Sequence, residues 1–159
     1  MKVKDIGMKE VYCADPSMNL SEIASMMKRY NVGVIPVCEG RKLLGMLTDR
    51  DLVITCIADN LDPNECGARE FMTANPATVT PDTDLEEAAG LMGREQVHRL
   101  PIVEDGNLVG IISLGDISLA SSGNGSLAAE TLHRISAPIC GSETATSGSF
   151  GMGLPYHSA

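Results

Sequence analysis

The sequence has few aromatic residues: it contains no Trp, two Phe and three Tyr among 159 residues. Without aromatic platforms a protein cannot stack the bases of a single-stranded nucleic acid. The formal net charge of −9 repels nucleic-acid phosphates and anionic membrane surfaces. No apolar run approaches the roughly 18 residues of a membrane span, and the first residues lack the apolar core of a signal peptide. We therefore expect a cytoplasmic protein that binds neither nucleic acid nor membrane.

Patterns typical of catalysis and metal binding are also missing. The five cysteines are widely spaced and form no C-x-x-C pair. No P-loop, metal-ligand spacing or nucleophile–base pair occurs at a motif. We predict that the chain is not an enzyme, holds no metal and requires no cofactor. Cys13, Cys38 and Cys56 are interpreted as small buried hydrophobic residues in a reducing compartment.

The sequence does contain an internal duplication. A shift of 65 residues superimposes the chain on itself without a gap from residue 16 to residue 52. Chance does not hold one register over such a span, so we infer two tandem copies of one unit. The identical pairs include Pro16 and Pro81, Leu20 and Leu85, Glu22 and Glu87, Ala24 and Ala89, Met27 and Met92, Val32 and Val97, Pro36 and Pro101, Gly45 and Gly110, and Asp51 and Asp116.

Each copy predicts the element order β-α-β-β-α, which is an α+β fold. The first helix of each copy follows a capping pattern, Asn19-x-x-Glu22 and Asp84-x-x-Glu87. Apolar residues then recur at i, i+3, i+4 and i+7, so each helix buries one face. We assign the first repeat to residues 1–60, a linker to 61–67, the second repeat to 68–122 and a Ser/Gly-rich tail to 123–159.

The tail differs from the repeats in composition. It is rich in Ser and Gly and has few large apolar residues. The segment LAAETLHRI at 127–135 predicts a short helix. Beyond Ala137 we expect a mobile end.

The middle strands of the two copies, VGVIPV and RLPIV, each contain a proline. Proline cannot donate to a sheet ladder, so Pro36 and Pro101 confine these strands to an edge or a bulge. We expect that such an edge leaves backbone N–H and C=O groups free for a ligand.

One motif closes both copies: GMLTDRD at 45–51 and GIISLGD at 110–116. Its hydroxyl and carboxylate are Thr48 and Asp51 in the first copy, and Ser113 and Asp116 in the second. One interpretation is a helix cap. That interpretation explains the second copy less well, because Leu114 stands where the first copy has a second capping candidate. The other interpretation is a site in which the carboxylate binds a ribose diol and the hydroxyl binds a phosphate at a helix N-terminus.

The paired motif, the gapless duplication and the VIPV and RLPIV strands together resemble the cystathionine-β-synthase (CBS) domain pair. The resemblance extends from residue 1 to about residue 120. It implies two tandem β-α-β-β-α CBS repeats related by a pseudo-two-fold axis, in a free-standing protein. It also implies a regulatory or sensor module that binds AMP, ADP, ATP or another adenosyl compound in clefts between the repeats.

The resemblance assigns roles to residues by position. Asp51 and Asp116 match the residues that hold the ribose hydroxyls, and Thr48 and Ser113 match the phosphate-facing hydroxyls. The residues implied at the base pocket are Ala14, Asp15, Pro16, Val34, Ile35, Pro36, Thr78, Thr80, Pro81, Leu100 and Pro101.

The segment VHRLP resembles the phosphate-contacting segment of the γ subunit of AMP-activated kinase, which places His98 and Arg99 at the central cleft. The first repeat departs from this pattern, because Gly33 and Val34 offer no cation there. We therefore expect one strong and one weak or empty nucleotide site, and the analogy with the kinase subunit implies that the strong one is at Asp51. The alternative for His98 is an exposed strand histidine without a ligand.

CBS pairs usually form flat homodimers through their helices, so the resemblance implies a homodimer and an unidentified regulated protein as partners. The helices near 20–30, 50–58, 85–95 and 116–122 are expected at the dimer interface. Two alternatives remain for function. One is a dimerisation or partner-docking module with empty clefts. The other is a redox or metal sensor that uses Cys13, Cys38 or His98.

Overall fold

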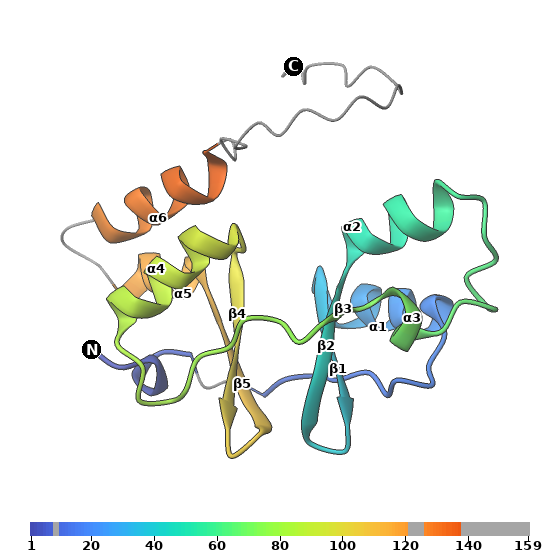
Figure 1. Cartoon of the computed structure of the whole chain (residues 1–159), viewed down its shortest axis with the longest axis horizontal. Helices are drawn as coiled ribbons and strands as arrows, with labels where there is room; N and C mark the ends of the chain where they lie inside the picture. The colour runs from blue at the N-terminus through green and yellow to red at the C-terminus, as the bar shows by residue number, and fades with distance from the viewer. Residues whose placement is uncertain (8–9, 121–125, 138–159) are drawn as a thin grey trace, which may run out of the picture.

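The computed structural model describes residues 1–7, 10–120 and 126–137, and its two repeats lie side by side around one sheet (Figure 1). The elements in chain order are η1 (Val3–Asp5), α1 (Leu20–Tyr30), β1 (Val34–Glu39), β2 (Lys42–Thr48), α2 (Asp49–Asp51), η2 (Leu52–Ile57), α3 (Ala68–Phe71), β3 (Thr73–Ala74), α4 (Leu85–Glu95), β4 (Arg99–Glu104), β5 (Asn107–Ser113), α5 (Leu114–Ala120) and α6 (Ser126–Ser136). Here η1 is a 3₁₀ turn and η2 is a π-helical turn that continues α2. The predicted α+β class is confirmed.

The first long helix of each repeat forms as the spacing predicts, but only one has the expected cap. The Asn19 side chain accepts from the Glu22 N–H, and Glu22 Oε2 accepts from the Asn19 N–H, each at 2.9 Å. The matching cap at Asp84 is wrong: its side chain makes no cap hydrogen bond to α4. The Asp84 carboxylate instead pairs with Lys2 Nζ at 3.0 Å, because the start of the chain passes beside it.

Two antiparallel hairpins, β1–β2 and β4–β5, form the sheet in the order β1-β2-β5-β4. The hairpins join only where Lys42 pairs with Asn107, near the turns, and the short strand β3 pairs with β2. Pro36 and Pro101 lie in the outermost strands of this order, so the predicted edge positions are confirmed. Both strands also carry a register shift just after the proline, at Val37/Cys38 and at Ile102/Val103.

The strand predicted at the start of each repeat is reduced to one bridged residue. Ala14 pairs in parallel with Val37, and Val79 with Ile102. The Pro36 carbonyl accepts from the Ala14 N–H at 2.8 Å, and the Pro101 carbonyl accepts from the Val79 N–H at 3.0 Å. The expectation that these edge carbonyls stay free for a ligand is therefore wrong, because the preceding segment of the same chain occupies them.

The two repeats exchange their leading segments. Val3, at the start of the chain, is fully buried in the core of the second repeat. Ala68, its counterpart after the 65-residue shift, is buried in the core of the first repeat. Matching backbone bridges accompany both exchanges, Lys2 with Asp84 and Gly67 with Asn19. Each core is thus completed by residues from the other half of the chain.

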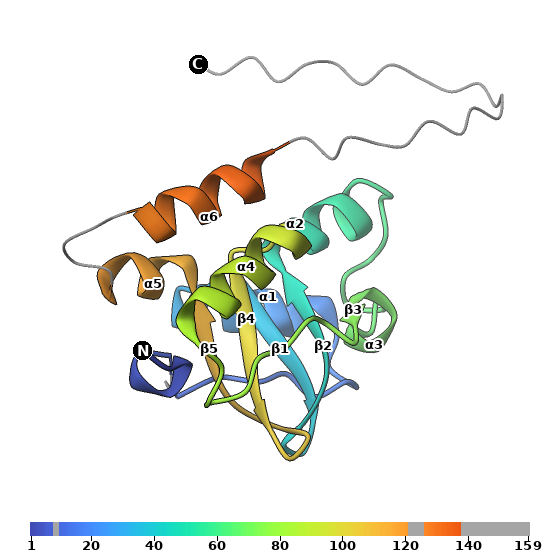
Figure 2. The same ribbon diagram turned by 60° about the vertical axis from the view of Figure 1, so that its left-hand side comes forward.

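Helix α6 covers α4 and α5 of the second repeat in both ribbon views (Figure 2). It matches the short helix expected in the tail, while the end expected to be mobile beyond Ala137 lies outside the described residues.

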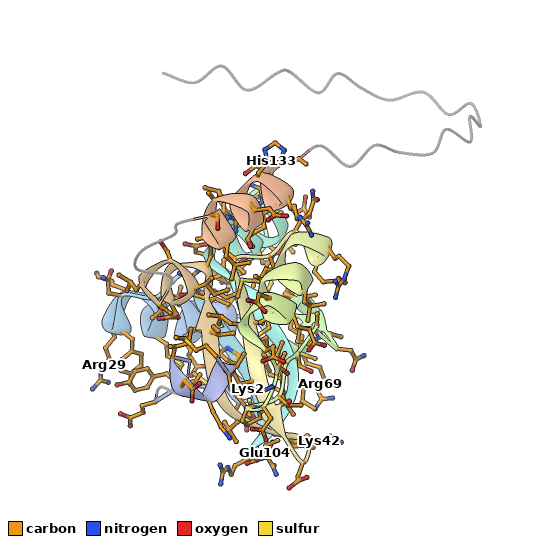
Figure 3. All side chains as sticks on the ribbon, turned by 90° about the vertical axis from the view of Figure 1, so that its left-hand side faces the viewer. Lys2, Arg29, Lys42, Arg69, Glu104 and His133 are labelled. Carbon is orange, nitrogen blue, oxygen red and sulfur yellow. The ribbon has the colours of Figure 1, made fainter. Side chains whose placement is uncertain are left out.

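In Figure 3, His133 lies on α6, at the opposite end of the molecule from the hairpin tips with Lys42 and Glu104. Within the described ranges, every helix is too short or too polar to cross a membrane.

Candidate functional site

The duplicated hydroxyl and carboxylate form a reciprocal capping box in each repeat. Asp51 Oδ2 accepts from the Thr48 N–H at 2.8 Å and from Thr48 Oγ1 at 2.7 Å, while Asp51 N donates to Thr48 Oγ1 at 3.1 Å. Ser113 and Asp116 repeat this pattern at 2.9, 2.6 and 3.2 Å. The cap therefore does not depend on the residue between them. The expectation that Leu114 makes a helix cap less suitable for the second copy is wrong. The box fixes each carboxylate in the first helical turn after its strand.

The first cleft is a cavity of about 640 Å³ that contains the Thr48–Asp51 box. Its opposite wall comes from the second repeat, which contributes His98 and Arg99 to the lining. Residues 75–77 form a further wall. The structure thus brings the predicted carboxylate, hydroxyl and cations of two repeats together in one cleft of a size typical for small-molecule sites.

The second cleft is the pseudo-symmetric counterpart and measures about 320 Å³. It contains Ser113 and Asp116, residues 31–36 of the first repeat, and residues 10–12. Residues 10–12 correspond to 75–77 after the 65-residue shift, so both clefts are built from equivalent segments.

Residue differences between these segments make the clefts unequal. Tyr12 stands in the second cleft where the first has Ala77, and its ring stacks on Tyr30 with centroids 3.6 Å apart. A tyrosine occupies space that an alanine leaves open, which is consistent with the smaller volume. Glu10 likewise stands where the first cleft has Asn75, and so adds a negative charge.

The cations are distributed unevenly as well. Arg99 lines both clefts, whereas His98 lines the first and not the second. The first cleft also includes Arg50 in its lining. In the second cleft, Arg99 faces two carboxylates, those of Glu10 and Asp116. The first cleft also contains Asp49, Asp51 and Glu95, so its advantage for an anionic ligand rests on its additional cations, Arg50 and His98.

Gly33 occupies the position in the first repeat that His98 occupies in the second, and a neighbouring residue differs together with it. The Gly33 carbonyl accepts from the Asp49 N–H at 3.1 Å, as the His98 carbonyl accepts from the Leu114 N–H at 2.9 Å. A Cβ atom on Gly33 would lie 2.9 Å from Asp49 Oδ2. Glycine at this position thus accompanies an aspartate at the start of α2, while histidine accompanies a leucine at the start of α5.

Some of the residues expected at the base pocket line the clefts, and others do not. Val34, Leu100 and Pro101 line the first cleft, and Val34, Ile35 and Pro36 line the second. The residues that line neither cleft are Ala14, Asp15, Pro16, Thr78, Thr80 and Pro81.

Local hydrogen bonds hold three of these residues, Ala14, Asp15 and Thr80. Ala14 is buried at its bridge to β1. The Asp15 carboxylate accepts from the Ser17 N–H and hydroxyl, which lower its pKa, and Thr80 bonds to Thr83. The walls are instead residues 10–12 and 75–77, which lie before the gapless match that begins at residue 16. Extending the 65-residue register backwards would have paired these two segments.

The cysteines also differ in part from their interpretation. Cys38 and Cys56 are buried as expected, but Cys13 is exposed, because it precedes the buried Ala14 on the outer edge of β1. In the described ranges, no three His, Cys, Asp or Glu side chains are grouped so that they could hold a metal ion.

Two segments of the chain, residues 3–56 and 68–123, match the CBS domain. The chain belongs to the CBS-domain family. It is 41% identical over 122 residues to CBS domain-containing protein YhcV of Bacillus subtilis, a match that covers 77% of this chain and 86% of YhcV. It is 34% identical over 116 residues to hypoxic response protein 1 of Mycobacterium tuberculosis, covering 72% of this chain and 81% of that protein.

Solved structures agree with the CBS assignment. A crystal structure of Hypoxic Response Protein I with two coordinated zinc ions has a TM-score of 0.70 and 33% identity, covering 76% of this chain and 98% of that one. The predicted tandem CBS pair is thereby confirmed. The zinc ions belong to that relative.

Proposed function

We propose that this CBS pair is a regulatory sensor that binds an adenine nucleotide, with the first cleft as the stronger site. The observation that carries the proposal is the meeting of the Thr48–Asp51 box with His98 and Arg99 in one cavity. Each group alone has a structural explanation, but the cavity combines an anchor for a diol with cations for a phosphate. Family membership supports adenine as the base.

The carboxylate accounts for a ribose. A carboxylate accepts hydrogen bonds from both hydroxyls of a vicinal diol, and each charged bond contributes about 1.5–3 kcal/mol. Because the capping box already fixes Asp51, binding costs little side-chain entropy there. A 2′-deoxynucleotide loses one of the two bonds, so we expect it to bind more weakly than the ribonucleotide.

The cations account for a phosphate. Arginine binds phosphate through two parallel N–H bonds, and histidine adds a charge when it is protonated. Both clefts contain carboxylates, but Arg99 is the one basic residue that the described lining of the second cleft contains, whereas the first cleft adds Arg50 and His98. We therefore propose one strong site per chain and one weak site.

Thermal unfolding with AMP, ADP, ATP, adenosine and 2′-deoxy-AMP tests the proposal. A ligand at 100 times its Kd stabilises the folded state by about 2.7 kcal/mol. Asp51→Asn keeps a side-chain acceptor for Thr48 but removes the charge, so we expect it to abolish most of the shift. Asp116→Asn is the matched control in the second cleft and should retain it.

Two outcomes would contradict the proposal. If Asp51→Asn and Asp116→Asn bind the ribonucleotide as the parent does, the carboxylates do not hold the ribose. If none of the adenosyl compounds shifts the unfolding temperature, the clefts do not serve as nucleotide sites. A dimerisation or docking role would then be favoured, because the first repeat exposes apolar residues of η2.

A further inference from the structure

Two cysteines of the first repeat lie beside the second cleft, and the nucleotide-binding proposal makes no use of them. Cys13 precedes Ala14, and Cys38 follows Val37, the β1 residue with which Ala14 is bridged. Two backbone hydrogen bonds hold this junction: Ala14 N donates to the Pro36 carbonyl at 2.8 Å, and Cys38 N donates to the Ala14 carbonyl at 2.9 Å. The bridge therefore keeps both cysteines at one fixed point on the sheet edge.

The two thiols interact and differ in accessibility. Cys13 is exposed, whereas Cys38 is buried with 3% of its surface accessible. A hydrogen bond between the thiols lowers the pKa of Cys13 and raises the pKa of Cys38. A solvent-exposed thiol with increased thiolate character beside a second thiol is the arrangement of an attacking and a resolving cysteine.

We propose that Cys13 and Cys38 form a reversible disulfide that fastens residues 10–13 to the edge of β1 and thereby fixes one wall of the second cleft. Glu10, Tyr12 and Pro36 line that cleft on the two sides of the junction. The pair belongs to the first repeat alone. The corresponding residues of the second repeat are Thr78 and Val103, although the same backbone bridge is present there between Val79 and Ile102.

The reaction requires a disulfide oxidant of low molecular weight, such as oxidised glutathione. The Cys13 thiolate attacks one sulfur of the oxidant, forms a mixed disulfide and releases one thiolate. The Cys38 thiol then loses its proton, attacks the Cys13 sulfur and releases the second thiol. One oxidant disulfide is reduced to two thiols, and two protein thiols are oxidised to one disulfide.

Another cysteine pair, Cys56 and Cys66, lies in the core of the first repeat and serves as the internal control. Cys56 and Cys66 also interact, but both are buried, and burial is the main cause of the raised pKa of Cys66. Cys56 Sγ donates to the Leu61 carbonyl at 3.6 Å. With neither thiol exposed, this pair should stay reduced while the protein is folded.

Peptide mapping of the full chain tests the proposal, with Cys140→Ser as background to remove the tail thiol. Trypsin separates Cys13 and Cys38 into peptides 10–28 and 30–41, whereas Cys56 and Cys66 share peptide 51–69. After treatment with oxidised glutathione, mass spectrometry under non-reducing conditions should find 10–28 linked to 30–41, lighter than their sum by two hydrogen atoms. Dithiothreitol should release them, and peptide 51–69 should stay reduced.

Two variants of Cys38 separate its role as the resolving cysteine from its role as the hydrogen-bond donor to Cys13. Cys38→Ser cannot form the disulfide, so Cys13 should accumulate the glutathione adduct. Cys38→Ala also removes the hydrogen-bond donor, so iodoacetamide should modify Cys13 several-fold more slowly than in the parent. A persistent Cys13 adduct in the parent, a disulfide between chains, or equal reactivity of Cys13 and Cys56 would overturn the proposal. None of these readouts depends on nucleotide binding.

Discussion

Arg99 is the residue on which the inequality of the two clefts depends. It is the first residue of β4 and lines both cavities. His98 precedes it and lines the first cavity but not the second. A single guanidinium shared by two clefts serves best the cleft that contains further cations, and the first cleft adds Arg50 and His98.

We predict that Arg99→Ala weakens AMP binding to the strong site by about 1–3 kcal/mol, because a charged hydrogen bond to phosphate is lost. Adenosine carries no phosphate, so its affinity should change little. Titration calorimetry with both ligands measures the difference. His98→Ala is the matched comparison and should affect the first cleft alone. Two equivalent sites in the parent, or an equal loss for adenosine, would contradict this interpretation.

The sequence predicted the capping residues and cations of the clefts better than their walls. Thr48, Asp51, Ser113 and Asp116 could be found because their spacing recurs and capping chemistry restricts the residue types. The wall residues carry no such constraint. Tyr12 and Ala77 occupy equivalent positions but differ in size and chemistry, so no shared pattern identifies them.

At the scale of elements, the packing of α6 on α4 depends on a glycine. A Cβ atom on Gly93 would lie 3.0 Å from Arg134 Cβ and 3.1 Å from Arg134 Cδ, closer than ordinary van der Waals contact. Gly90, one turn earlier in α4, has only Arg94 Nη1 nearby, at 3.5 Å. The two glycines therefore offer a matched pair within one helix.

We predict opposite effects for alanine at these positions. Gly90→Ala should raise the free energy of unfolding by about 0.5–1 kcal/mol, because alanine favours the helix. Gly93→Ala gains the same propensity but crowds α6, and overpacking costs about 1–3 kcal/mol. Urea unfolding of both variants gives the comparison. Equal stabilisation by the two substitutions would show that α6 does not pack against Gly93 in solution.

The sequence predicted secondary structure well where the spacing of nearby residues determines it. The spacing of Leu20, Ile23 and Met27 predicts α1, and all three side chains are buried. Contacts between distant parts of the chain determine other features, such as the start of α4. Asp84 occupies the cap position of α4, but Lys2 lies beside it and pairs with its carboxylate. A contact between residues so far apart in the chain has no local signature.

At the scale of the whole molecule, the exchange of leading segments couples the two repeats. Val3 is fully buried in the second core, so Val3→Ala should lower the free energy of unfolding by about 1–3 kcal/mol. Val53→Ala is the control and should have little effect, because Val53 is 52% exposed. Thermal unfolding of the variants tests this. An unchanged unfolding temperature for Val3→Ala would indicate that the first residues do not dock on the second repeat.

The duplication predicted two tandem copies of one unit, and the 65-residue register does relate α1, β1 and β2 to α4, β4 and β5. It could not predict the exchange, because a repeat in sequence does not specify which copy a segment packs against. It also did not predict the position of α6, which lies on the helices of the second repeat and has no counterpart in the first. The pseudo-two-fold relation is therefore broken at the helical face.

Because α6 lies on the second repeat alone, it changes which helices can form the expected dimer interface. Helices of both repeats were expected at the interface, but α6 packs on α4 and α5 of the second repeat within the chain, where Leu119 of α5 remains 77% exposed. In the first repeat, Val53, Ile54 and Ile57 of η2 are 52%, 48% and 67% exposed. Such a group of apolar side chains on one turn is typical of an interaction surface. We therefore propose a homodimer in which this face meets its own copy across a two-fold axis.

Light scattering coupled to size exclusion tests the dimer at micromolar concentration. Val53→Lys combined with Ile57→Lys should convert the dimer to a monomer without unfolding it, because both side chains are exposed and their charges repel across the axis. Leu132→Lys, on α6, places the same charge on the opposite repeat at a residue that is 47% exposed, and should leave the dimer intact. A monomeric parent would exclude the dimer. Dissociation by Leu132→Lys alone would instead locate the interface on α6, and the apolar turn of η2 would then need a different partner.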